Sequence, residues 1–88
     1  MIIASAIKFY IDKTDSEVIL CGLRHGNIFV QLKNLGFSPR KGYKEICQGF
    51  LDNNGNFLDR YEAFIHAKNA GQIISNTTDN ELYSEDLW

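Results

Sequence analysis

The residues best suited to chemistry lie together at positions 24 to 27, where Arg24, His25, Gly26 and Asn27 follow an apolar run. A guanidinium can form two hydrogen bonds with one phosphate, and an imidazole can donate another or stack on a base. If a helix begins here, its first amide groups favour an anion, and Gly26 leaves the backbone open to it. The pattern indicates a phosphate site. The alternative is a polar turn in which Arg24 pairs with a carboxylate and His25 caps the turn.

A second candidate site consists of Phe57 and Arg60, which flank the predicted start of a later helix. An aromatic ring can stack on a base while a guanidinium binds a phosphate. The alternative is that Phe57 packs in the core, because it alternates with the polar Asn56, and that Arg60 pairs with Glu62 or with the C-terminal segment.

Carboxylates near the C-terminal end form a third candidate set, made of Glu81, Glu85 and Asp86. They could bind ribose hydroxyls, a metal ion or one of the arginines, although a solvated charge run is the commonest meaning of such residues. Four apolar or aromatic residues accompany them: Leu82 and Tyr83 lie between Glu81 and Glu85, and Leu87 and Trp88 follow Asp86. We therefore expect residues 72–88 to form a tail that docks on the domain or on another copy of the chain.

Catalysis and metal binding find little support in the sequence. His25 could act as a general acid or base, but no GxSxG elbow or comparable nucleophile motif accompanies it. His66 falls beside a predicted buried helix stripe, where a histidine is more often a packing or surface residue than a ligand. Cys21 and Cys47 form no CxxC pair, so we expect buried free thiols, no metal site and no cofactor.

Two hairpins are predicted to position the candidate residues. Residues 2–11 alternate as a strand does, and residues 17–23 resume the apolar run after a turn, which gives an antiparallel hairpin. One face of the first strand is expected to hold Ile3, Ser5, Ile7, Phe9 and Ile11. A second hairpin is predicted over 46–51 and 56–58, because the Asn and Gly residues between them suit a tight turn.

Two helices complete the predicted fold. The first runs from Asn27 to a stop at Gly36, with one face formed by Ile28, Phe29, Leu32 and Leu35. The second opens at Asp59, which is spaced as an N-cap with Glu62 as its partner, and extends through Ala70. Its inward stripe is expected to be Ala63, Phe64, Ala67 and Ala70. The expected fold class is α+β, a small antiparallel sheet from two hairpins with two helices packed on it.

Length and composition predict one domain over residues 1–88. The 88 residues are 44% hydrophobic and 23% charged with a single proline, which is typical of a folded chain. A net charge of −2 with scattered lysines and arginines disfavours binding to duplex nucleic acid. The chain has no apolar run long enough for a membrane span and no basic signal-peptide start, so we expect a cytoplasmic protein without a membrane partner.

Taken in order, the stretches CGLRHG, QGFLDNNGNFLDRYEA, AGQI and LYSEDLW resemble a widespread set of short phage and prophage proteins. Within that set the chain is similar to the Thoeris anti-defence sponges, which sequester cyclic ADP-ribose signals. The resemblance implies a homo-oligomer that holds a cyclic nucleotide without cleaving it, in the host cytoplasm during infection. It also implies that Arg24 binds phosphate, that Phe57 and Arg60 line the pocket, and that Glu85 and Asp86 close it.

Three hypotheses of function follow. The first is a phage sponge for a cyclic nucleotide immune signal, either a cyclic ADP-ribose isomer or a cyclic oligonucleotide. The second is an inhibitor that binds a host defence protein directly through the aromatic and acidic C-terminal tail. The third is an enzyme that degrades the nucleotide, with His25 as general acid or base.

Overall fold

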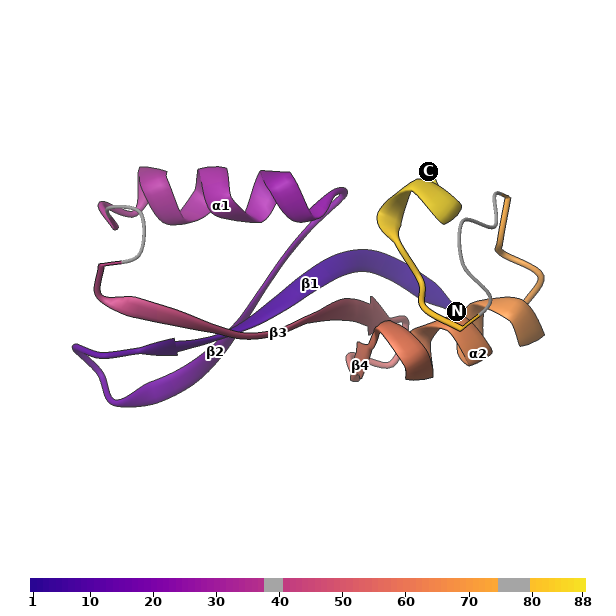
Figure 1. Ribbon diagram of the computed structural model, residues 1–88, viewed down its shortest axis with the longest axis horizontal. Coiled ribbons are helices and arrows are strands. Elements are labelled where there is room, and N and C mark those ends of the chain that lie inside the picture. The colour runs from indigo at the N-terminus through magenta and orange to yellow at the C-terminus, as the bar shows by residue number, and fades with distance from the viewer. Residues whose placement is uncertain (38–40, 75–79) are drawn as a thin grey trace.

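The computed structural model describes residues 1–37, 41–74 and 80–88, which contain a four-stranded antiparallel sheet and two α-helices (Figure 1). The elements in chain order are β1 (Ile2–Ile11), β2 (Ser16–Gly22), α1 (His25–Asn34), β3 (Tyr43–Asp52), β4 (Phe57–Asp59), α2 (Arg60–Asn69) and the 3₁₀ turn η1 (Ser84–Asp86). The predicted fold class, a small antiparallel α+β fold, is confirmed. Residues 38–40, between the first predicted helix and the second predicted hairpin, lie outside the described residues.

The sheet has the strand order β2-β1-β3-β4, so that β1 pairs with one strand from each hairpin. The β-branched and aromatic side chains of β1 suit this central position. β3 begins three residues before the predicted strand, whereas β4 is short and pairs only with residues 49 to 51. A register shift between Ile2 and Ala4 puts Ile2 in the core and leaves Ile3 52% exposed. The predicted face was therefore wrong at Ile3, because a bulge interrupts the alternation.

Helix α1 lies along one face of the sheet and covers the first core cluster (Figure 1). This cluster contains Ile7, Phe9, Ile11, Ile28 and Leu32. The helix begins at His25, two residues before the predicted start, so Arg24 is its N-cap. Its buried residues are His25, Ile28 and Leu32. Phe29 and Leu35 are exposed, so the prediction that they share a buried face with Ile28 and Leu32 was wrong. The buried residues lie three and seven positions after His25.

Helix α2 packs against the second core cluster, at the other end of the sheet from the β1–β2 turn (Figure 1). The Asp59 side chain accepts hydrogen bonds from the main-chain nitrogens of Tyr61 and Glu62, and Glu62 Oε1 accepts one from the Asp59 nitrogen, which confirms the predicted capping box. The buried stripe is Ala63, Phe64 and Ala67. Ala70 is exposed at the C-cap, so its predicted burial was wrong.

The described part of the tail packs against the second core cluster. Leu82 is fully buried and Leu87 is 9% exposed, and both contact the cluster that also holds Phe50 and Phe64. The Ile74 nitrogen donates to the Asp86 carbonyl oxygen at 2.7 Å, and the Leu82 nitrogen donates to the Arg60 carbonyl oxygen at 2.9 Å. The tail thus completes the core around the N-terminal part of β1.

The two cysteines are free, but their predicted burial was wrong. Cys21 is exposed and Cys47 is half-buried, because both lie on the sheet face opposite α1. Among the residues that the structure describes, no helix combines the length and apolar character that crossing a membrane requires.

Candidate functional site

The guanidinium of Arg24 lies against the C-terminal tail. Its Nη2 donates to the main-chain oxygen of Trp88, and its Nη1 lies 3.7 Å from Glu85 Oε1. The ion pair is exposed on both sides, at 41% for the Arg24 side chain and 64% for that of Glu85. A ligand at Arg24 has to share this cation with the tail or displace Glu85.

His25 occupies the first turn of α1 and points into the protein. The ring Nε2 lies 2.8 Å from the Gly49 carbonyl oxygen, and the ring contacts Phe50 edge-on at a centroid distance of 5.2 Å. Burial of the ring lowers the pKa of His25, and the Arg60 cation contributes to the same shift, against opposing effects of the Gly49 carbonyl and Glu85. The neutral ring thus links the start of α1 to β3 through a hydrogen bond and a ring contact.

Gly26 and Asn27 are exposed at the start of α1. The Arg24 nitrogen donates to Asn27 Oδ1 at 2.9 Å, and the Asn27 nitrogen donates to the Arg24 carbonyl oxygen at 3.0 Å. Asn27 thus closes the first turn of the helix by its side chain and its amide. A Cβ added to Gly26 would meet no atom within 4 Å, so the backbone there is open to solvent.

Arg60 binds the tail from the other side. Its Nη1 donates to the Leu82 carbonyl oxygen at 2.7 Å, and its Nη2 donates to Gln48 Oε1 at 2.6 Å. The guanidinium carbon also lies 4.4 Å from the centroid of the Tyr83 ring, a cation–π contact. A guanidinium carries five N–H donors, so these two bonds use only part of its hydrogen-bonding capacity.

Phe57 and Asp86 fill structural positions. Phe57 lies on the sheet face opposite α1, half-buried, with the Lys8 Nζ 5.1 Å from the centre of its ring. The Asp86 side chain is 1% exposed, and its Oδ2 accepts a hydrogen bond from the Tyr83 nitrogen, which closes η1. Arg24 and Arg60 therefore both contact the tail that carries Glu85 and Asp86, whereas His25 packs on β3 and Phe57 lies on the opposite face of the sheet.

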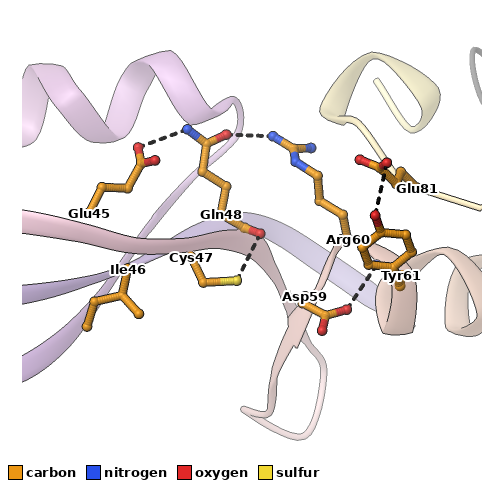
Figure 2. A pocket seen from close by; sticks show the side chains of 8 residues that line it. All are labelled: Glu45, Ile46, Cys47, Gln48, Asp59, Arg60, Tyr61 and Glu81. Carbon is orange, nitrogen blue, oxygen red and sulfur yellow. Dashed lines mark hydrogen bonds between the residues drawn. The ribbon is translucent and has the colours of Figure 1, made fainter.

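An open cavity of about 400 Å³ lies where the outer edge of β3 meets the start of α2 (Figure 2). It is lined by Glu45, Ile46, Cys47, Gln48, Asp59, Arg60, Tyr61 and Glu81. β4 pairs only as far as Gly49, which leaves the edge of β3 beyond it open, and the capping turn at Asp59 brings the next two side chains to the same place. Figure 2 shows Gln48 between Glu45 and Arg60, hydrogen-bonded to both.

The cavity wall mixes three carboxylates with one guanidinium. Tyr61 donates a hydrogen bond to Glu81 Oε1 at 3.2 Å, and the Glu81 charge raises the pKa of the Tyr61 hydroxyl. Burial, with help from Asp59, raises the pKa of Cys47, so its thiol is protonated and a poor nucleophile. Such a wall offers acceptors for hydroxyl and amino groups beside one cation for a phosphate.

Of the residues singled out from the sequence, Arg60 and Glu81 line this cavity. Sequence reasoning missed the others because they come from β3 and from the β4–α2 corner, which only the folded sheet brings together. One signal was present: the capping box fixes Asp59, Arg60 and Tyr61 at a hairpin-to-helix corner, where consecutive polar and aromatic side chains splay outward. Among residues 1–37, 41–74 and 80–88, no group of three or more His, Cys, Asp or Glu side chains is arranged to hold a metal ion.

A family model described as "Phage T4 y16D protein" matches residues 1–88. The chain belongs to this phage protein family. The expected phage kinship is therefore confirmed over the whole chain. No curated protein and no solved structure matches it.

Proposed function

We propose that this phage protein is an anti-defence sponge, which binds a cyclic nucleotide immune signal without cleaving it, in the host cytoplasm and as a homo-oligomer. The observation that carries the proposal is the cavity that Arg60 and Tyr61 line beside three carboxylates. A nucleotide needs this mixture, because its phosphate accepts hydrogen bonds from a guanidinium while its ribose hydroxyls and base amino groups donate to carboxylates. Tyr61, at 54% exposed, offers a ring on which a base can stack.

The size of the cavity supports a ligand of this class. About 400 Å³ lies within the roughly 300–1,000 Å³ of small-molecule sites. A sponge must compete with the effector for a scarce signal, which demands roughly −8 to −12 kcal/mol. One phosphate contact, a stacked base and several hydrogen bonds to ribose hydroxyls are the contacts from which this site would have to supply that free energy.

The two alternative functions draw less support from the side-chain geometry. The tail as an adhesive surface for a host protein would need exposed apolar groups, but Leu82 and Leu87 pack in the core. A nucleotide-degrading enzyme would need His25 free to reach a substrate. Its ring instead contacts the Gly49 carbonyl oxygen and Phe50.

A depletion assay tests the sponge proposal. Purified protein is mixed with cyclic ADP-ribose isomers and with cyclic di- and trinucleotides, separated from free ligand, heated, and the released ligand is analysed by chromatography. We expect recovery of one intact ligand. Tyr61→Ala should abolish depletion, whereas Ile65→Ala, a similarly exposed position of α2 outside the cavity, should not.

Three outcomes would contradict parts of the proposal. If no nucleotide is depleted, the sponge function is wrong. If degradation products appear in place of intact ligand, the protein is an enzyme. If Tyr61→Ala binds normally while Arg24→Gln does not, the ligand lies at the Arg24 and Glu85 corner and not in the cavity. Circular dichroism of each variant shows that it is folded.

A further inference from the structure

The outer edge of β2 is an open sheet edge of unusual character. Among the described residues, β2 pairs with β1 alone, so its other side presents main-chain N–H and C=O groups. It is seven residues long, and its sequence SEVILCG has four consecutive apolar residues and one charge, at Glu17. Natural sheets protect such edges with lysine, proline, a bulge or a covering segment, because an open edge is a template for another strand.

The other edge of the sheet is better protected. It is formed by β4, which is three residues long, and by residues 43 to 48 of β3, which extend beyond it. They carry Lys44 and Glu45 side by side, and a register shift interrupts their pairing with β1 between Lys8 and Phe9. β2 has no register shift along its pairing with β1. The contrast singles out β2 as the edge to which a strand can add.

We propose that β2 pairs antiparallel with β2 of a second copy, which joins two sheets into one across a two-fold axis at Ile19. In this register Ile19 lies opposite its own counterpart, Glu17 lies opposite Cys21, and Val18 lies opposite Leu20. These pairs keep each side chain on its own face of the sheet, as a continuous sheet requires.

The apolar pairs on both faces support this partner. Val18 and Leu20 are half-buried and already pack against the first core cluster, so their counterparts extend that cluster across the axis. On the opposite face Ile19 is 43% exposed and meets its own counterpart. Cross-strand β-branched and aliphatic pairs of this kind are what stabilise neighbouring strands.

The single charge of the strand selects the antiparallel direction. A parallel addition would stack Glu17 on Glu17, and like charges directly opposite are unfavourable. In the antiparallel register the two Glu17 side chains are separated by four residues, roughly 13 Å, which exceeds the Debye length of about 8 Å at physiological salt. At the far end Gln31 Nε2 donates to the Cys21 carbonyl oxygen, and that oxygen can accept a second hydrogen bond.

Light scattering with two matched variants tests the interface. The wild type should have twice the 10.0 kDa chain mass across a concentration series. Ile19→Lys should reduce it to one chain mass. Ile46→Lys alters a similarly exposed isoleucine on the β3 edge (47% against 43%) and should leave the dimer intact. A monomeric wild type, a dimer that survives Ile19→Lys, or a dimer that Ile46→Lys disrupts would each overturn the proposal.

Disulfide trapping tests the register without weakening the interface. In a Cys47→Ser background, Glu17→Cys puts the new thiol opposite Cys21 of the second copy, at a distance a disulfide can span. Oxidised glutathione should convert this variant to a covalent dimer. Each protein disulfide that forms reduces one oxidised glutathione to two glutathione molecules. Ser16→Cys points to the other face and should not cross-link. Equal cross-linking of both variants, or none with Glu17→Cys, contradicts the register. This dimer needs no ligand, so its failure and that of the sponge proposal are distinguishable.

Discussion

Gly49 provides the sharpest test of how the hairpin places Arg60 and Tyr61. A Cβ at this position would overlap the main-chain oxygen of Leu58 and lie 2.8 Å from Phe57 Cζ. The Leu58 atom belongs to the backbone of β4 and cannot rotate away. Gly49→Ala therefore has to push β4 off the edge of β3, and β4 runs directly into the Asp59 cap of α2.

The expected cost of Gly49→Ala follows from two opposing effects. Replacing a glycine stabilises a compatible position by about 0.4–1 kcal/mol, because the unfolded chain loses freedom. Overpacking costs about 1–3 kcal/mol, and a clash with backbone belongs at the upper end. We expect a net loss of about 2 kcal/mol, which lowers the melting temperature by roughly 8–16 °C for a domain of this size.

Thermal and urea denaturation of Gly49→Ala and Gly26→Ala provide the measurement. Gly26 lies in the first turn of α1 with no atom within 4 Å of its added Cβ, so alanine there should raise stability by up to about 1 kcal/mol. The two substitutions are chemically identical and should have opposite signs. If Gly49→Ala is as stable as the wild type, the close packing of Phe57 and β4 over Gly49 is wrong.

Two further predictions concern the core around the site. Because burial lowers the pKa of His25, the folded state takes up its proton less readily than the unfolded state, so stability should fall as the pH drops below about 6.5. His25→Gln should weaken this pH dependence in denaturation curves between about pH 7 and pH 5. An unchanged pH dependence would show that His25 is not its source. Leu82→Ala should cost about 2–5 kcal/mol, because Leu82 is fully buried, whereas Ile74→Ala at 72% exposed should stay within about 0.5 kcal/mol. Equal effects in denaturation would show that the tail does not dock as described.

Local patterns were enough to predict the fold. The alternation in residues 2–11 predicted the bounds of β1, and the spacing of Asp59 and Glu62 predicted the cap and start of α2. Both signals act over a few residues, so the sequence displays them directly. The bulge near Ile3 and the early start of α1 depend on strand register and on a buried histidine, which neighbouring residues do not reveal.

The candidate site was harder to predict than the fold. Arg24 and Arg60 were recognised as cations, but their partners lie 64 and 22 residues away, in the tail. The cavity forms because β4 is shorter than β3, and the length of pairing between two strands is a tertiary property. The types of the polar residues therefore suggested candidates for a site without indicating which of them share a wall.

The two arginines differ in how readily they can serve a ligand. An exposed ion pair contributes about 0–1 kcal/mol, so replacing Glu85 by a phosphate at Arg24 costs little. The hydrogen bonds of Arg60 are part-buried, and bonds to charged groups contribute about 1.5–3 kcal/mol each, so a ligand gains nothing by displacing Leu82 or Gln48. In the proposed site, a ligand has to bind Arg60 through the remaining N–H groups, while the existing hydrogen bonds hold the guanidinium in place. Such a fixed cation loses little side-chain freedom when the ligand arrives, which is the advantage of the cavity over the exposed corner at Arg24.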